Sequence, residues 1–351
     1  MENHHEIAWI HRMNQPAFCV REGKIQDANH AARGRLVPIG GPVEPLLATG
    51  KAEYRNLRDG WLHLTVNIQE VTYPVTVQRL GQWDIFTLEQ EDIPGELKAL
   101  SLAAQKMRTP LGGLFATVEH LSASLSGEEN SKDLSLMERN LYQLLRLVQN
   151  MDYGARCLQE PPRLELRDVT ALVREIFAKL DEYCRELGCT LSYTGPATPA
   201  YSLIDSVQLE DTINKILTNS LCHGAKGTIT AKLTRRGNTL YLTVQDPPGR
   251  KAPKFGGNIF TQYLREPVYE PGQTGLGLGL SIISAFASAH GGTVLLEPQK
   301  SGMRLTLSLP MRQDDLVRTP TLRPDLTGGQ DIALVELSEV LPWELYGPGS
   351  K

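Results

Sequence analysis

Long apolar runs are missing from this chain, and so are the cysteine patterns that mark disulfide or zinc frameworks. No uninterrupted apolar stretch approaches the ~20 residues needed to cross a bilayer, and the opening MENHHEIAWIHRMN has no apolar signal core. The five cysteines are odd in number and scattered, without a CxxC pair. We therefore expect no transmembrane segment, and the cysteine usage fits the reducing cytoplasm.

A strong charge of either sign is absent as well. The 36 basic and 40 acidic residues give a formal net charge of −4, and the pI is near 6.1, so nothing indicates a nucleic-acid partner. Hydrophobic residues make up 41% of the 351 positions, which is enough to bury a sizeable core. A chain of this length is long enough for two or three domains.

The first 92 residues contain short β-like runs separated by turns. Alternating apolar residues predict a hairpin, a short helix over 29–36 capped by Asn29, and three antiparallel strands; the runs are 16–20, 24–28, 61–68, 73–80 and 83–89. This order resembles a PAS-type sensory domain, and the phrase GKIQDANHAA is similar to the usual opening of that domain. We expect a PAS-like domain over 1–92, with a generic small α+β module as the alternative.

Two long amphipathic stretches follow the Pro94-Gly95 break. Their apolar residues recur at steps of three and four, the spacing of a heptad seam; they are Leu97, Leu100, Ala104, Met107, Leu111, Leu114, Val118, Leu121 and Leu125, then Leu134, Met137, Leu141, Leu144, Val148 and Met151. We therefore predict an antiparallel helical hairpin over 93–159. One hairpin exposes much of its apolar stripe, which favours a dimeric four-helix bundle; packing against its own chain is the alternative.

Residues 160–312 show a mixed pattern. Strand-like runs alternate with amphipathic helices, which favours a layered α/β domain; the helices are expected at 168–187, with Asp168 as cap, at 206–223 and at 276–290. The last segment, 313–351, is rich in Pro, Gly and Asp and is expected to be a flexible tail. Its stretch DIALVELSEVLPWEL could instead dock as a short amphipathic helix.

The segment GQTGLGLGLSII carries the strongest chemical signal in the chain. Its glycines leave backbone N–H groups open to an anion and permit positive φ, and the N-terminus of a helix follows directly. We expect this glycine-rich segment to bind a phosphate group. The segment has neither the Walker lysine nor the Rossmann spacing, so it belongs to neither of those nucleotide-binding motifs.

Together with three other landmarks, this segment resembles the second glycine box of sensor histidine kinases, whose ATPase fold is shared with gyrase, Hsp90 and MutL. INKILTNSLCHGA resembles the N box, LTVQDPPG the first glycine box, NIFTQYLRE the F box, and AHGGTVLLEPQKSGMRLTLSLP the closing segment. The resemblance implies a two-layer α/β sandwich over 160–312 that binds ATP and Mg²⁺. Asn219 would hold Mg²⁺ and Asp246 would accept a hydrogen bond from adenine. The other implied nucleotide-binding residues are His223, Gly249, Gly275, Gly277 and Gly279.

The stretch MRTPL resembles the H box of the same family, in which a histidine and an acidic residue precede x-Arg-Thr-Pro on the first hairpin helix. Here these two positions hold Gln105 and Lys106. A glutamine amide is a poor nucleophile, and a lysine cannot serve as a carboxylate general base. Thr109, which in the family supports dephosphorylation of the partner receiver domain, is retained. Pro110 is expected to bend the helix at the turn behind it.

The nucleotide motifs also depart from the family pattern. Lys215 stands where an asparagine is usual, four residues before Asn219, and Cys222 replaces a basic residue. Pro248 occupies a glycine position of the first glycine box, and proline provides neither an N–H group nor a positive φ there. Binding of ATP is expected to persist but to be weaker.

As a whole, the resemblance implies a multidomain α+β protein of cytoplasmic two-component signalling. It would bind Mg·ATP, yet as a pseudokinase it would not autophosphorylate at Gln105. The implied partners are a second copy or another histidine kinase, and the receiver domain of a response regulator. Three alternatives stay open: a kinase that acts in trans within a heterodimer, a response-regulator phosphatase that uses Thr109, and a non-enzymatic dimeric scaffold.

Overall fold

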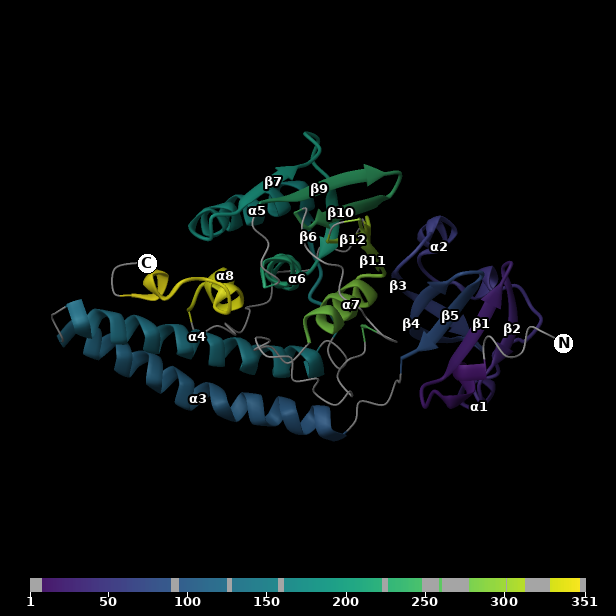
Figure 1. Ribbon diagram of the computed structural model, residues 1–351, viewed down its shortest axis with the longest axis horizontal. Coiled ribbons are helices and arrows are strands. Elements are labelled where there is room, and N and C mark those ends of the chain that lie inside the picture. The colour runs from purple at the N-terminus through teal and green to yellow at the C-terminus, as the bar shows by residue number, and fades with distance from the viewer. Residues whose placement is uncertain are drawn as a thin grey trace.

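A ten-stranded sheet runs through the computed structural model, which describes residues 8–89, 95–124, 128–156, 161–222, 227–247, 259–260, 278–300, 302–312 and 329–347. The strand order is β2-β1-β5-β4-β3-β11-β12-β10-β9-β7 (Figure 1). Its members are β1 (Ala17–Arg21), β2 (Lys24–Ala28), β3 (Trp61–Ile68), β4 (Val71–Leu80), β5 (Trp83–Leu88), β7 (Thr190–Thr194), β9 (Thr228–Arg236), β10 (Thr239–Gln245), β11 (Thr293–Pro298) and β12 (Met303–Pro310). A separate pair joins β6 (Glu165–Asp168) to β8 (Tyr201–Ile204).

The N-terminal five strands are antiparallel and follow the order β2-β1-β5-β4-β3. Two short helices accompany them, α1 (His30–Arg33) and α2 (Lys51–Asn56), with the 3₁₀ turns η2 (Ala8–Arg12) and η3 (Glu44–Leu46). Asn29 caps α1 as predicted, because its side-chain oxygen accepts from the N–H groups of Ala32 and Ala17. A core of aromatic and aliphatic side chains fills this part, with Phe18 stacked on Phe86.

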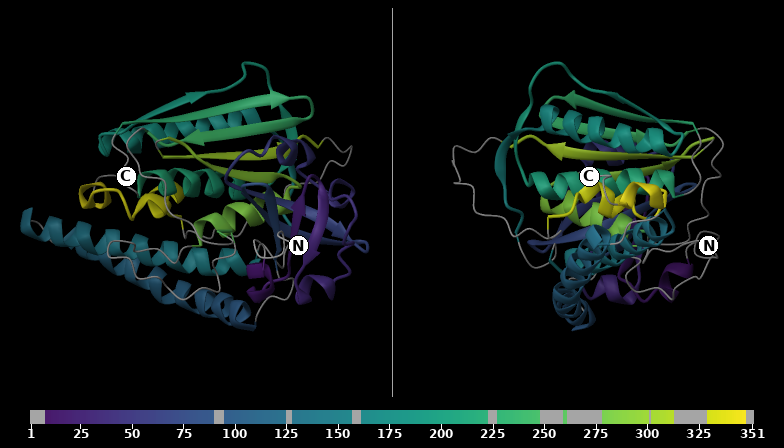
Figure 2. Two further views of the ribbon diagram at one scale, coloured as in Figure 1. Left: turned by 45° about the vertical axis from the view of Figure 1, so that its right-hand side comes forward. Right: turned by 90° about the vertical axis from the view of Figure 1, so that its left-hand side faces the viewer.

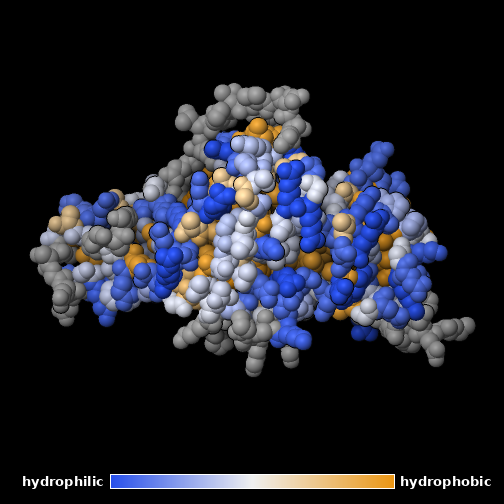
Figure 3. All heavy atoms as spheres, turned by 90° about the horizontal axis from the view of Figure 1, so that it is seen from above, coloured by the Kyte–Doolittle hydropathy of each residue, from blue (hydrophilic) through white to orange (hydrophobic). Residues whose placement is uncertain are grey.

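The mixed region places helices on one face of β7 and β9–β12. These helices are α5 (Val169–Glu186), α6 (Ser206–Leu221) and α7 (Gly279–Ala289), and Asp168 caps α5 by accepting from two backbone N–H groups. Every second residue of β9 and β10 is buried, as a half-covered sheet requires. Seen from above, the molecule presents mostly hydrophilic residues, with apolar residues in small separate groups (Figure 3).

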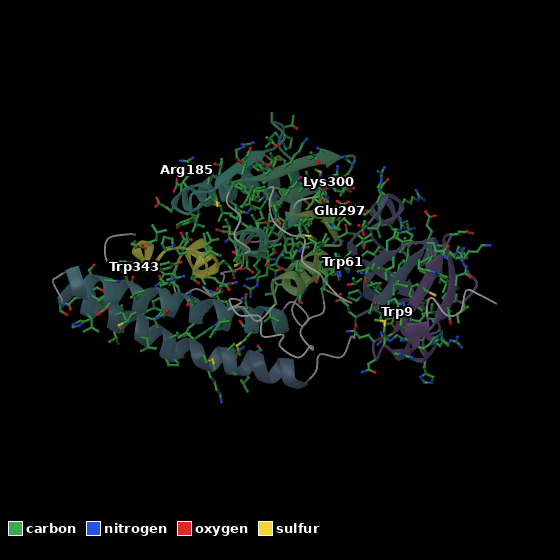
Figure 4. The ribbon with its side chains drawn as sticks, viewed as in Figure 1. Trp9, Trp61, Arg185, Glu297, Lys300 and Trp343 are labelled. Carbon is green, nitrogen blue, oxygen red and sulfur yellow. The ribbon has the colours of Figure 1, made fainter. Side chains whose placement is uncertain are left out.

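The β-rich N-terminal part and the mixed part contribute strands to one continuous sheet. The predicted domain boundary at residue 92 gave no indication of this pairing. Strand β3 pairs antiparallel with β11, in the register His63 opposite Val294 and Trp61 opposite Leu296. Trp61 lies at this junction (Figure 4). Gly60 permits the close approach: at φ +102°, a Cβ atom there would lie 2.2 Å from the carbonyl oxygen of Leu296.

Two long helices, α3 (Gly95–Ser124) and α4 (Glu128–Arg156), run alongside each other beneath the helical layer (Figures 1 and 2). Alternate members of the predicted apolar stripes are buried between them, namely Ala104, Leu111, Val118, Leu134, Leu141 and Val148. The intervening members Met107, Leu114, Met137 and Leu144 are 46–49% exposed. Helix α3 continues through Pro110. No helix in the described ranges is long and apolar enough to cross a membrane.

Residues 329–347 are docked, so the expectation of a flexible tail does not hold for this segment. It forms α8 (Ile332–Leu337) and the 3₁₀ turn η5 (Trp343–Tyr346), and the docked amphipathic helix was the alternative. The apolar side chains of α8 belong to the same core as α5 and α6. Figure 2 shows α8 between the sheet layer and the hairpin, and Figure 4 labels Trp343, whose ring lies 5.7 Å from Lys132 Nζ on α4.

Candidate nucleotide-binding site and phosphoacceptor position

The N-terminus of α7 and the C-terminal part of α6 meet at Asn219. A Cβ atom added to Gly279, the first residue of α7, would lie 3.3 Å from Asn219 Oδ1 and 3.4 Å from Nδ2. The Asn219 Nδ2 atom is buried and has no hydrogen-bond partner among the described residues. A glycine that keeps this space clear and an unsatisfied amide beside a helix N-terminus form a cradle suited to a phosphate group and its cation.

Asp246 lies immediately after β10 and is 6% exposed. Its Oδ2 atom accepts from the N–H group of Met303 at 3.0 Å, and its own N–H group donates to the Met303 carbonyl at 3.0 Å. Gly302 has φ +80°, and a Cβ atom there would lie 2.7 Å from Asp246 Cβ. The close approach of the β12 start therefore holds a buried carboxylate at the C-terminal end of β10, an interior strand of the sheet.

Four predicted nucleotide-binding residues, His223, Gly249, Gly275 and Gly277, lie outside the described residues. Within the described ranges no group of three His, Cys, Asp or Glu side chains could hold a metal ion. Among the described residues at this cradle, Asn219 Oδ1 is a side-chain oxygen that could contact Mg²⁺. An amide oxygen with phosphate oxygens and water suits that ion, which usually keeps several waters and is held largely by substrate phosphates.

Phe260, within the predicted F box, contacts the N-terminal part of the chain. Phe260 is 1% exposed, and its ring centroid lies 5.5 Å from that of His63 on β3. His63 is itself buried, with Nε2 2.7 Å from Ser288 Oγ on α7 and Nδ1 3.2 Å from Glu89 Oε1. One N-terminal histidine therefore contacts both the F box and α7, which the sequence did not indicate.

The predicted phosphoacceptor position, Gln105, lies on α3, outside the hairpin core. Gln105, Lys106 and Thr109 are all exposed, whereas the neighbouring Ala104 is fully buried. The structure thus places the three predicted hairpin residues on an accessible surface of one helix. It does not bring them into contact with Asn219 or Asp246 through any described hydrogen bond or ion pair.

The arginine of the same stretch has a structural role. Arg108 Nη2 donates to Asp152 Oδ2 on α4 at 2.7 Å, and Ser101 Oγ donates to the other oxygen of that carboxylate at 3.1 Å. The Asp152 side chain is 2% exposed. The pair therefore ties α3 to α4 at the level of the H-box sequence.

Removal of Asp152 is expected to loosen the hairpin. The change Asp152→Ala leaves Arg108 partly buried without its partner, and we expect the free energy of unfolding to fall by about 3 kcal/mol, because loss of one member of a buried pair is costly. Urea denaturation followed by circular dichroism measures this. Asp133→Ala, an exposed site on the same helix, should change stability by less than about 0.5 kcal/mol. Equal effects of the two variants would contradict the assigned role.

A buried ionic cluster occupies the side of α6 that faces α4 and α8. Lys215 Nζ is 3.2 Å from Asp211 Oδ1 and 2.7 Å from Asn150 Oδ1, and it forms an ion pair with Glu336 of α8. Burial alone would lower the pKa of Lys215, but the Asp211 and Glu336 carboxylates outweigh it and raise that pKa. The sequence marked Lys215 as a departure from the family pattern, yet nothing in it pointed to Glu336.

His290 connects the end of α7 to the start of α6. Its Nε2 accepts from the N–H group of Asp205, the α6 cap, at 3.2 Å, and its Nδ1 lies 2.9 Å from the Phe286 carbonyl oxygen. These two partners require a neutral ring with the proton on Nδ1. Burial lowers the pKa of His290, against the opposing effects of the Phe286 carbonyl and the Asp205 carboxylate; Arg312 acts in the same direction as burial.

We expect His290 to make stability depend on pH. Because its pKa is lower in the folded than in the unfolded chain, its contribution is complete above about pH 6.5 and is lost as the pH falls below that value. Urea midpoints at pH 7.5 and 5.5 should therefore differ more for the wild type than for His290→Gln. A larger acid loss in the variant would refute the assignment. Comparing the wild type with the variant cancels the pH dependence that the carboxyl groups contribute to both proteins.

Comparison with known proteins agrees with this geometry. Residues 204–313, which contain Asn219, Asp246 and α7, match the family model of the histidine kinase-, DNA gyrase B- and HSP90-like ATPase. Sensor histidine kinase CusS of Escherichia coli K12 is 25% identical over 257 residues, which cover 70% of this chain and 52% of CusS. Sensor protein RstB of the same strain is 28% identical over 214 residues, covering 59% of this chain and 47% of RstB.

A third relative, histidine kinase P4 of Formosa agariphila, is 22% identical over 257 residues, or 70% of this chain and 19% of that protein. The chain thus spans about half or less of the length of these curated relatives. Among solved structures, full-length ShkA in complex with AMPPNP aligns with a TM-score of 0.50 and 19% identity, over 62% of this chain and 46% of ShkA. That likeness concerns the fold alone.

The fold and the cradle therefore define an ATPase domain of the type shared by histidine kinases, gyrase B and HSP90. Beyond this domain as well, the chain is similar to sensor histidine kinases, at 25% identity to CusS and 28% to RstB.

Proposed function

We propose that this protein is a two-component signalling component that binds Mg·ATP through residues 160–312 and does not autophosphorylate at residue 105. The observation that carries the binding proposal is the cradle of Asn219 and Gly279 at the start of α7, because its amide is unsatisfied and its space is kept clear by a glycine. Asn219 would orient Mg²⁺, and the buried Asp246 carboxylate would accept from the adenine amino group. Asn219, Gly279 and Asp246, the predicted nucleotide-binding residues that the structure describes, support this proposal.

The hairpin position supports a degenerate kinase. Gln105 and Lys106 are exposed on α3, so they are accessible to a nucleotide-bearing domain, but neither supplies the required chemistry. Bound ATP would provide a transferable γ-phosphoryl group. An amide nitrogen has no basic lone pair to attack it, and the Lys106 ammonium has no lone pair to remove a proton. Thr109 is exposed as well, and would be accessible to the receiver domain of a response regulator.

The alternating burial along α3 and α4 supports dimerisation of this hairpin. The exposed residues Met107, Leu114, Met137 and Leu144 recur with the same period as the buried seam, so they form a second apolar stripe along both helices. A stripe of this kind is costly in water, and a second hairpin would cover it as a four-helix bundle. The partner would be another copy of this chain or the hairpin of a different histidine kinase.

The N-terminal part would serve as the input domain. Its strand order β2-β1-β5-β4-β3 and its two short helices between β2 and β3 are consistent with a PAS-like domain. Its β3 edge pairs directly with β11 of the ATPase domain. A conformational change in this domain would therefore be transmitted to the ATPase sheet through the β3–β11 backbone hydrogen bonds as well as through α3.

Binding of nucleotide can be tested by thermal unfolding in the presence of Mg·ATP. A ligand that binds only the native state at about 100 times its Kd adds about 2.7 kcal/mol of stability, so we expect the melting temperature to rise with Mg·ATP concentration. A melting temperature that does not change up to millimolar Mg·ATP would contradict the proposal and favour a non-enzymatic scaffold.

A further inference from the structure

Lys215 is a buried ammonium group located one helical turn before Asn219. The two residues are four apart on α6, so they lie on the same face with Cβ atoms about 6 Å apart. The Lys215 side chain is 3% exposed, and its flexible four-carbon stem can move the charge by several ångströms. The cation therefore lies within reach of any phosphate group that occupies the cradle beside Asn219.

In this structure, Lys215 is bound by an acid from a distant part of the chain. Glu336 belongs to α8, 121 residues further along, and its side chain is 1% exposed. The backbone of α8 also lies against α6, because Thr218 Oγ1 is 3.5 Å from the Glu336 carbonyl oxygen. A buried carboxylate from outside the ATPase motifs therefore holds the ammonium group that lies one helical turn before Asn219.

The segment 329–347 is held in place on both sides. On the hairpin side, Arg139 donates to the Ser338 and Glu339 carbonyl oxygens at 3.2 Å each, and Arg146 pairs with Glu336 at 3.3 Å. On the ATPase side, Lys179 of α5 lies 2.9 Å from Asp331 Oδ1. The segment thus bridges α4 to the ATPase domain, and its contacts are polar as well as apolar.

The charges of this cluster leave no capacity for a further anion. Lys215 and Arg146 are the two cations, and three carboxylates face them, those of Asp211, Glu336 and Glu339. A phosphate group close by would add negative charge to a site that already carries one excess acid in low-dielectric surroundings. Glu336 and the phosphate would then compete for Lys215.

We propose that α8 is an internal competitor of the nucleotide: Glu336 occupies Lys215, and when α8 leaves, Lys215 turns toward the phosphate groups held beside Asn219. Nucleotide binding and docking of 329–347 then oppose each other. The inference rests on the proposed nucleotide binding, and it gives Lys215 a role as a phosphate ligand. Without nucleotide, Lys215 is thus held by the protein's own C-terminal segment.

Titration of the full chain with Mg·ATP, comparing the wild type with Glu336→Gln, tests this. The glutamine amide has nearly the shape of the Glu336 carboxylate but carries no charge, and Lys215 retains its contacts with Asp211 and Asn150. The apparent Kd for Mg·ATP should fall about tenfold, because the apparent affinity scales with the fraction of molecules in which α8 has released Lys215. Glu344→Gln, the same change at an exposed position of the same segment, should leave the Kd unchanged. An equal Kd for Glu336→Gln and wild type would overturn the inference alone.

Hydrogen exchange on the wild-type protein gives a second result that does not depend on a variant. Saturating Mg·ATP should accelerate exchange of the backbone amides of residues 332–337, because the nucleotide displaces α8. Slower or unchanged exchange at saturation would overturn the competition while the binding proposal survives. No binding by either the wild type or Glu336→Gln would instead overturn both the proposed function and this inference.

Discussion

The double variant Gln105→His/Lys106→Glu is expected to take up phosphate from Mg·ATP, whereas the wild-type chain takes up none at residue 105. Both positions are exposed on α3, so the new imidazole is accessible and the new carboxylate lies beside it. Imidazole is a competent nucleophile, and a carboxylate can act as its general base. Incubation with radiolabelled ATP, followed by acid and base treatment, should reveal acid-labile, base-stable phosphate in the variant only.

Gln105→Ala/Lys106→Glu is the matched control, since it has the same new acid without an imidazole. The exposed His120 lies 15 residues along the same helix, or about 22 Å away, so it should not become labelled in either protein. Acid-labile label on the wild-type chain would contradict the assignment of a degenerate phosphoacceptor. A double variant that binds Mg·ATP but stays unlabelled would show that these two side chains are not what the chain lacks.

The change Gly60→Ala is expected to separate the two halves of the ten-stranded sheet. The added Cβ atom would lie 2.2 Å from the Leu296 carbonyl oxygen and would force a non-glycine residue to φ +102°. Steric overlap with backbone cannot be relieved by rotating a side chain, so β3 must move away from β11. We expect a loss of at least about 3 kcal/mol of stability, since strain and lost pairing add.

Urea denaturation and hydrogen exchange on β11 measure this effect together. Gly81→Ala serves as the control, because Gly81 also has positive φ (+61°) but an added Cβ atom there meets nothing within 4 Å. It should cost only about 1–2 kcal/mol of backbone strain and leave β11 protected. If both variants lose equal stability and β11 keeps its protection in Gly60→Ala, the sheet junction does not depend on Gly60.

Local features of this fold were predictable because their causes are local. Asn29 and Asp168 cap helices through side-chain oxygens that accept hydrogen bonds from nearby backbone N–H groups. Caps of this kind can be predicted from the sequence. Strands with period-two burial and helices with heptad spacing follow from the same short-range patterns. The order of the nucleotide motifs singled out Asn219 and Asp246, which the fold places beside the start of α7 and the start of β12 respectively; their roles in binding nucleotide stay predictions.

Long-range pairings could not be obtained in this way. The apolar runs of β3 and β11 would suit many partners, and only the three-dimensional structure shows that Gly60 fits against Leu296. The ion pair of Lys215 with Glu336 joins residues 121 positions apart, and a charged residue in an amphipathic stretch is usually solvated. The sequence alone therefore favoured a flexible tail where the structure has a docked helix.

Binding of Mg·ATP to the Asp246 site can be measured by calorimetric titration of the purified 351-residue chain and of its Asp246→Ala variant. We expect saturable binding at one site per chain for the wild type. We expect loss of that binding in Asp246→Ala, because the adenine amino group loses the carboxylate that accepts its hydrogen bond. Absence of binding in the wild type, or undiminished affinity in Asp246→Ala, would contradict the proposal that this protein binds Mg·ATP through Asp246.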